Sequence, residues 1–123
     1  MAKILIVDDE PEIIFLAKKM LEKDGHVVIA AKNSAECFEK IKDETPDLIL
    51  MDVMLPDGDG WESCKKLKEN EETRNIPIAT FTVRASDNSV DRSFRHAHAD
   101  AHISKPFTKK ELLKAVENLV GSK

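Results

Sequence analysis

Acidic, hydroxyl and basic side chains stand directly after apolar runs of the sequence. In chain order these residues are Asp8, Asp9 and Glu10, then Asp52, then Thr82, and then Lys105. Carboxylates that converge repel each other strongly, which favours a shared hard cation such as Mg²⁺ with oxygen ligands. A lysine and a threonine hydroxyl suit phosphoryl oxygens, and a carboxylate beside them can act as a nucleophile. The set therefore predicts phosphoryl chemistry assisted by a divalent cation, if the fold brings its members together.

Five short runs could position these residues as strands. Four of them are nearly continuous and apolar, at residues 4–7, 27–30, 48–51 and 76–81. Such runs are typical of strands buried on both faces of a parallel sheet. The run at 101–103 is shorter and more polar, so we expect it at a sheet edge if it is a strand.

Stretches with helical spacing separate and follow these runs. The predicted helices cover residues 13–21, 33–41, 61–67, 90–97 and 108–120, the fourth with the weakest apolar stripe. The first pattern stops at Gly25, a favourable C-terminal cap. Two others begin with capping-box spacing, Asn33 with Glu36 and Thr108 with Glu111.

Strand and helix patterns thus alternate five times. This order predicts one doubly wound α/β domain over residues 1–123, with a five-stranded parallel sheet and helices on both faces. In such sheets the functional crevice lies beyond the carboxyl ends of the strands, where the reactive residues are expected.

Composition excludes several function classes. Lys plus Arg number 19 against 23 Asp plus Glu, and the net charge of -4 disfavours direct binding to nucleic acid or to an anionic membrane. The 2 cysteines, Cys37 and Cys64, fall within helix-like patterns, and we find neither a signal-peptide pattern nor an apolar run of about 18 residues. We therefore expect a folded cytoplasmic protein.

Four short motifs of the chain are each modest alone, but their order and spacing together are distinctive. They are residues 4–10 (ILIVDDE), 48–56 (LILMDVMLP), 81–82 (FT) and 104–107 (SKPF). Together they resemble the receiver domain of two-component response regulators over essentially the whole chain. The resemblance implies the flavodoxin-like strand order 2-1-3-4-5. It also implies a cis Lys105–Pro106 peptide bond.

The resemblance also implies roles for single residues. Asp52 is the implied phosphoacceptor. The implied ligands of Mg²⁺ (or Mn²⁺) are Asp8, Asp9, Asp52 and the backbone carbonyl of Met54. The implied phosphoryl-binding residues are Thr82 and Lys105.

By the same resemblance the protein is a phosphorylation-activated switch rather than an enzyme, with at most hydrolysis of its own aspartyl phosphate. The donor would be a histidine kinase or a phosphotransfer protein. The fourth predicted helix, the fifth strand and the fifth helix would form the surface that controls an unknown protein target. The chain would be a monomer or a weak dimer through that surface.

Three residues matter for how such a switch behaves. His102 stands where receivers generally carry Tyr or Phe, the aromatic that works with Thr82 in the switch. Because imidazole titrates near pH 6.5, we hypothesise a pH-dependent switch surface, although His102 could equally be a plain edge-strand residue. The resemblance implies that Met54 and Arg84 occupy positions that tune hydrolysis of the phosphorylated state. Neither can accept a proton from water, so we predict a long-lived phosphoryl group.

Other interpretations of these residues remain open. The chain could be the N-terminal receiver piece of a longer regulator with a DNA-binding or enzymatic output domain. A flavodoxin-like electron carrier would share the fold, but the acidic segment 8–10 would repel a flavin phosphate. An aspartate-nucleophile phosphatase would need an Asp-x-Asp-x-Thr pattern after the first strand, and residues 8–12 (DDEPE) do not have it. Asp57 and Asp59 we assign to a turn, and His96, His98 and His102 are weakly spaced for a soft metal.

Overall fold

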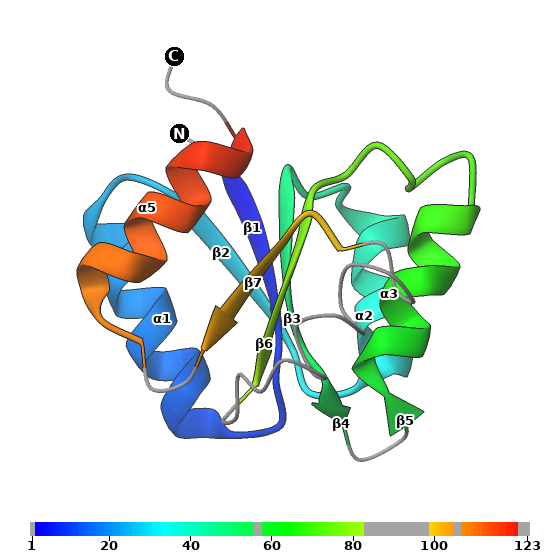
Figure 1. Cartoon of the computed structure of the whole chain (residues 1–123), viewed down its shortest axis with the longest axis horizontal. Helices are drawn as coiled ribbons and strands as arrows, with labels where there is room; N and C mark the ends of the chain where they lie inside the picture. Colours follow the sequence, from blue (N-terminus) through cyan, green and yellow to red (C-terminus); the bar gives the residue numbers. More distant parts are fainter. Residues whose placement is uncertain (1, 56–57, 83–98, 105–106, 121–123) are drawn as a thin grey trace.

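A parallel sheet forms the centre of the computed structural model, which describes residues 2–55, 58–82, 99–104 and 107–120. The sheet has 5 strands in the order β2-β1-β3-β6-β7 (Figure 1). The strands are β1 (Lys3–Val7), β2 (Val27–Ala31), β3 (Leu48–Asp52), β6 (Ile78–Thr82) and β7 (Ala101–Ser104). They are the five predicted strands taken in chain order, so the predicted α/β fold and the order 2-1-3-4-5 are confirmed.

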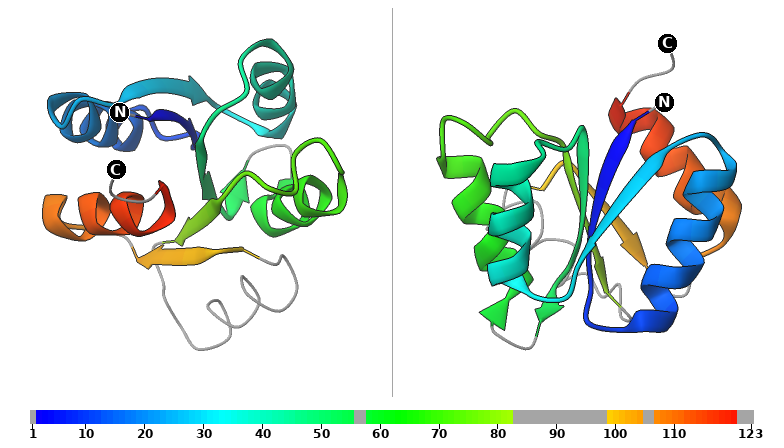
Figure 2. Two further views of the ribbon diagram at one scale, coloured as in Figure 1. Left: turned by 90° about the horizontal axis from the view of Figure 1, so that it is seen from above. Right: turned by 180° about the vertical axis from the view of Figure 1, so that it is seen from behind.

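Helices cover both faces of this sheet, as predicted. Helices α1 (Pro11–Lys23) and α5 (Lys109–Val120) lie on one face, and α2 (Ser34–Asp43) and α3 (Gly60–Glu69) lie on the other (Figure 2). The helix predicted at residues 90–97 lies outside the described residues. Among the described helices, none is both long and apolar enough to cross a bilayer.

Alternate residues of the central strands supply two separate cores. Leu5 and Ile49 pack with Cys64 of α3 on one face, whereas Ile6 and Leu50 pack with α5 on the other. Every residue of β3 is buried. Because packing on both sides resists displacement, the last residue of β3, Asp52, is held by a rigid strand.

Strand β2 differs from the prediction of burial on both faces. Val27 is 52% exposed, and only Ala31 at the far end of the strand is buried. The reason is its place in the sheet, since among the described strands β2 pairs with β1 alone and forms an edge. An apolar run reports β-propensity, but it does not reveal how many neighbours a strand has.

The predicted helix caps are confirmed by backbone geometry and hydrogen bonds. Gly25 follows α1 with φ 92°, the left-handed conformation that closes a helix. The Glu36 backbone N–H donates to Asn33 Oδ1 at 2.8 Å at the start of α2. At α5, Thr108 and Glu111 exchange reciprocal bonds, in which each backbone N–H donates to the other side chain.

A short antiparallel hairpin follows β3. Strands β4 (Met54–Leu55) and β5 (Gly58–Asp59) pair with each other in the segment that we predicted as a turn. Figure 1 shows the hairpin at the same edge of the sheet as the loop from β1 to α1. The carboxyl ends of β1 and β3 therefore meet there.

Candidate functional site

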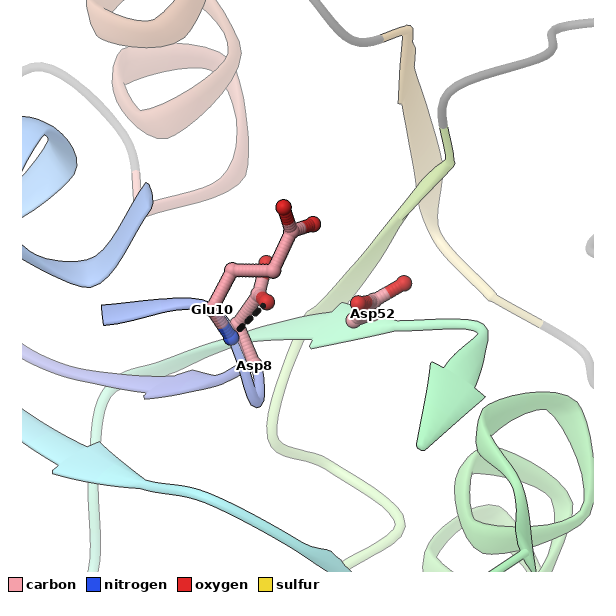
Figure 3. A group of neighbouring side chains, drawn as sticks. All are labelled: Asp8, Glu10 and Asp52. Atoms are coloured by element: carbon pink, nitrogen blue, oxygen red, sulfur yellow. Dashed lines mark hydrogen bonds between the residues drawn. The ribbon is translucent and has the colours of Figure 1, made fainter. Parts of the chain in front are cut away.

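Three carboxylates come together at the carboxyl ends of β1 and β3. One oxygen from each of Asp8, Glu10 and Asp52 lies within 4.8 Å of the other two (Figure 3). Asp8 is 0% exposed and Asp52 is 5% exposed, whereas Glu10 is exposed. In the part of the chain that the structure describes, no other three Asp, Glu, His or Cys side chains converge in this way.

Strand pairing and one turn build this carboxylate site. Val7 pairs with Met51 in the parallel ladder, so the next residues, Asp8 and Asp52, leave neighbouring strands at the same level. The Glu10 backbone N–H donates to Asp8 Oδ1 at 2.9 Å. This local bond turns the chain after β1 and places the Glu10 side chain beside Asp8, immediately before α1 begins.

Gly60 lets helix α3 approach the end of β3 closely. Its backbone N–H donates to the Val53 carbonyl at 2.9 Å. A Cβ at this position would lie 2.7 Å from Val53 Cα and 2.8 Å from the Asp52 carbonyl carbon, with the Asp52 carbonyl oxygen closer still. No side chain fits in that space, so glycine is required for the backbone contact that supports Asp52.

The structure brings together two of the predicted metal ligands and adds one residue that we did not assign. Asp8 and Asp52 lie together as expected. Asp9 is exposed and does not belong to the group, and Glu10 is the third member instead. The available signal for Glu10 was its place two residues after Asp8, the spacing of a side-chain-to-backbone turn.

The other predicted site residues lie at or beyond the edge of the described chain. Met54 opens β4, and its backbone pairs with Asp59. Thr82 ends β6 opposite Ser104, but its side chain is not among those described. Lys105 and Arg84 lie outside the described residues, so their roles stay predictions.

His102 has a hydrogen-bonding partner that the sequence did not suggest. It lies opposite Thr80 in the sheet, and Thr80 Oγ1 is 3.0 Å from His102 Nδ1. Thr80 is fully buried, and burial lowers the pKa of His102 below its ordinary value of 6.5. The folded chain therefore favours the neutral imidazole. His96 and His98 lie outside the described residues, so a metal group of three histidines stays untested.

The donor set suits a hard divalent cation. Mg²⁺ and Mn²⁺ prefer carboxylate, carbonyl and water oxygens, and Mg²⁺ usually takes one or two protein carboxylates. The buried carboxylates of Asp8 and Asp52 and the exposed carboxylate of Glu10 lie close together, so a bound divalent cation would reduce the repulsion between them. Asp52 would then present a nucleophilic oxygen beside the cation, an arrangement that favours phosphoryl transfer.

Known proteins share this arrangement of sequence and fold. The model of the response regulator receiver domain matches residues 4–117. Protein PilH of Pseudomonas aeruginosa is 34% identical over 122 residues, which cover 98% of this chain and 99% of PilH. The alkaline phosphatase synthesis transcriptional regulatory protein PhoP of Bacillus subtilis is 40% identical over 111 residues, which cover 89% of this chain and 45% of PhoP.

Solved structures agree with the sequence matches. The chemotaxis protein CheY4 of Vibrio cholerae superposes with a TM-score of 0.90 at 28% identity, covering 97% of this chain and 98% of CheY4. Fold, carboxylate site and sequence therefore lead to one conclusion. The chain belongs to the response regulator receiver domain family of two-component signalling.

Proposed function

We propose that Asp52 accepts a phosphoryl group from the phosphohistidine of a histidine kinase or phosphotransfer protein, with Mg²⁺ or Mn²⁺ in the carboxylate site. Receiver domains are phosphorylated on an aspartate, bind Mg²⁺ at an acidic pocket and interact with histidine kinases and downstream targets. The observation that carries the assignment to Asp52 is its convergence with Asp8 and Glu10 at the carboxyl ends of two buried strands.

The reaction is an in-line displacement at phosphorus. An oxygen of the Asp52 carboxylate forms the new O–P bond while the P–N bond of the donor breaks, and the electron pair of that bond leaves with the imidazole. Buried β3 and the close contact with Gly60 hold the attacking group in place. When bound, the cation neutralises charge on the phosphoryl oxygens. We expect Thr82 and Lys105 to bind those oxygens as well.

Two residues compete for the third acidic position of the cation site. Glu10 has the geometric support, because its carboxylate lies within 4.8 Å of the other two, and Asp9 has the support of the family resemblance. Trp61, the sole tryptophan, directly follows Gly60 and so can report cation binding by fluorescence. Whichever of Glu10→Gln and Asp9→Asn weakens Mg²⁺ binding more identifies the ligand.

An exposed apolar surface on α1 fits a protein donor. Phe15 is 66% exposed and Leu16 is 42% exposed, on the helix that begins one residue after Glu10. A donor that brings phosphohistidine to Asp52 has to contact elements beside the site, and exposed large apolar side chains favour protein contact. Phe15→Ala should slow transfer from a phosphorylated donor protein but not from acetyl phosphate. Equal slowing with both donors would contradict this docking site.

The switch and the lifetime of the phosphoryl group follow from residues around the acceptor. We propose that Thr82 and His102 couple phosphorylation to the surface near β7, and that the protein itself turns over no substrate.

Met54 is apolar and Arg84 has only hydrogen-bond donors, so neither can activate the water that would hydrolyse the phosphoryl group. Met54→Asn combined with Arg84→Glu should therefore speed the decay that follows removal of the donor.

The direct test of the proposal is phosphorylation by acetyl phosphate followed by intact-mass spectrometry. With Mg²⁺ the unmodified chain should gain about 80 Da, the mass of one phosphoryl group, and with EDTA it should not. Asp52→Asn should abolish the gain. Asp43→Asn, which removes a carboxylate at the exposed end of α2, is the matched control and should react normally. An undiminished adduct on Asp52→Asn would exclude Asp52 as the acceptor.

A further inference from the structure

Asp100 joins three parts of the chain at the amino ends of β6 and β7. Lys68 Nζ of α3 lies 2.6 Å from Asp100 Oδ2. The same Oδ2 accepts the Ile78 backbone N–H at 2.8 Å, and the Asp100 backbone N–H donates to the Ile78 carbonyl at 2.8 Å. Asp100 therefore contacts both backbone polar groups of the first residue of β6.

Lys68 ties the same place to the end of helix α3. Its ammonium group also donates to the Ile76 carbonyl at 2.8 Å and to the Arg74 carbonyl at 3.3 Å. The side chain of Lys68 is only 12% exposed, whereas that of Asp100 is 40% exposed. A shielded ammonium group with several acceptors makes short, directional bonds, so this network holds its members more firmly than an ordinary surface ion pair.

Besides the Thr80–His102 bond and the buried Ile103, strand β7 relies on the Asp100 contacts to specify its register. Among the described strands, β7 lies at an edge of the sheet and pairs with β6 alone. Its four residues pair with β6 from Ala79↔Ala101 to Thr82↔Ser104. Parallel ladder bonds repeat along a strand, so a short edge strand can slip unless a specific contact fixes it. The two bonds between Ile78 and Asp100 lie directly before the first of these pairs.

We propose that the Lys68–Asp100 pair is a remote positioning device for the phosphoryl site, because it fixes the register of β7 on β6. This inference rests on the proposed function of Thr82 and Lys105. Thr82 and Ser104 face each other at the far ends of these strands, and Lys105 is the residue after Ser104. A slip of one residue would move the end of β7 by about 3.3 Å, far more than a hydrogen bond tolerates.

The position of this pair predicts a selective effect on the site. The carboxylates that would hold the cation follow β1 or end β3, and neither Lys68 nor Asp100 bonds to a residue of those strands; the nearest link is the pairing of Ile78 with Ile49 of β3. The residues expected to bind phosphoryl oxygens follow or end β6 and β7. Loss of the pair should therefore weaken binding of a phosphoryl group without weakening binding of Mg²⁺. A pair that only stabilised the fold would not weaken phosphoryl binding while leaving Mg²⁺ binding unchanged.

The test compares binding of Mg²⁺ alone with binding of beryllofluoride, a phosphoryl mimic, at saturating Mg²⁺, both followed by Trp61 fluorescence. Asp100→Ala removes both side-chain contacts and should weaken beryllofluoride binding on the order of tenfold, with Mg²⁺ binding within about twofold of normal. Asp100→Asn keeps an oxygen for the Ile78 N–H and should have a smaller effect. Lys68→Met breaks the ion pair but keeps the Ile78 N–H bond to Asp100, so it should weaken beryllofluoride binding less than Asp100→Ala does. Lys3→Met, which breaks the exposed pair of Lys3 with Glu44 at 3.6 Å, is the matched control and should change neither constant.

Either of two results in the binding assays would overturn the positioning role. Unchanged beryllofluoride binding in Asp100→Ala would leave the pair a purely structural one, and equal losses of Mg²⁺ and beryllofluoride binding would indicate general loosening. Failure of the unmodified chain to bind either probe would instead refute the proposed function. Amide hydrogen exchange tests the register separately, since Asp100→Ala should speed exchange in the β6–β7 ladder and leave the β1–β3 ladder unchanged. No change in the β6–β7 ladder would also refute the inference.

Discussion

Gly60→Ala tests the close contact between helix α3 and the backbone of the acceptor residue. The added methyl group would lie 2.7 Å from Val53 Cα and closer still to the Asp52 carbonyl oxygen, whereas ordinary contact begins at 3.4 Å, so the two segments must separate by more than about 0.7 Å. The Gly60 N–H···O bond to Val53, now 2.9 Å, would lengthen beyond about 3.6 Å and be lost. Alanine at this position therefore changes both packing and hydrogen bonding.

The expected cost follows from these two changes. A lost hydrogen bond contributes about 1 kcal/mol and overpacking about 1–3 kcal/mol, offset by roughly 0.5–1 kcal/mol from the stiffer unfolded chain. We expect the free energy of unfolding to fall by about 2–3 kcal/mol, which corresponds to a Tm lower by roughly 8–12 °C. Because Asp52 belongs to the displaced backbone, Mg²⁺ binding should weaken as well.

Urea unfolding followed by far-UV circular dichroism measures the loss, and Trp61 fluorescence measures Mg²⁺ binding. Gly25→Ala is the matched control, because it adds the same methyl group at a position with φ 92° at the end of α1. It should cost about 1–2 kcal/mol through backbone strain and leave Mg²⁺ binding unchanged. A Gly60→Ala chain that is no less stable than Gly25→Ala and binds Mg²⁺ normally would refute the reasoning.

Three further predictions concern the pH dependence, the thiols and a helix cap. Burial lowers the pKa of His102, so the unfolded chain binds a proton at this imidazole more readily than the folded chain does. The free energy of unfolding should therefore fall as the pH drops below about 6.5. His102→Phe should flatten this decline, measured as urea midpoints at several pH values, and an unchanged slope would contradict the prediction. Burial raises the pKa of Cys64 to about 12 and Cys37 is fully buried, so a thiol reagent at pH 8 should modify both in urea and neither in the native chain. Thr108→Ala removes the acceptor for the Glu111 N–H and should lower stability by about 1 kcal/mol, which Thr108→Ser should largely restore. Equal unfolding midpoints for the alanine and serine variants would show that the cap bond is unimportant.

Strand and helix positions were predictable where local sequence decides the structure. The continuous runs of β1 and β3 became buried strands because both lie inside the sheet. The same type of run in β2 became a half-exposed edge, since strand order depends on long-range pairing that a local pattern does not contain. The hairpin of β4 and β5 was missed for a related reason, because turn-forming residues also occur in the tight loop of a hairpin.

The candidate site was predictable in its chemistry and less so in its exact members. Asp8 and Asp52 were expected together because parallel strands end at one edge of the sheet, and the structure places them there. Glu10 rather than Asp9 lies beside these two carboxylates, because the Glu10 backbone N–H bonds to Asp8 and turns the chain after β1. Which of Asp9 and Glu10 binds the cation stays a prediction. The need for Gly60 was not visible in the sequence, since it arises from contact between segments that only the folded chain brings together.

The central claim is that the phosphoryl group resides on Asp52, and fragmentation of the intact phosphorylated chain in a mass spectrometer tests it most directly. Backbone cleavages on either side of residue 52 divide the chain so that the adduct of about 80 Da can be placed. The account predicts the adduct on every N-terminal fragment that includes Asp52 and on none that ends at Met51. An adduct on fragments that contain only Asp8 and Glu10, or on fragments that begin after Asp52, would contradict it.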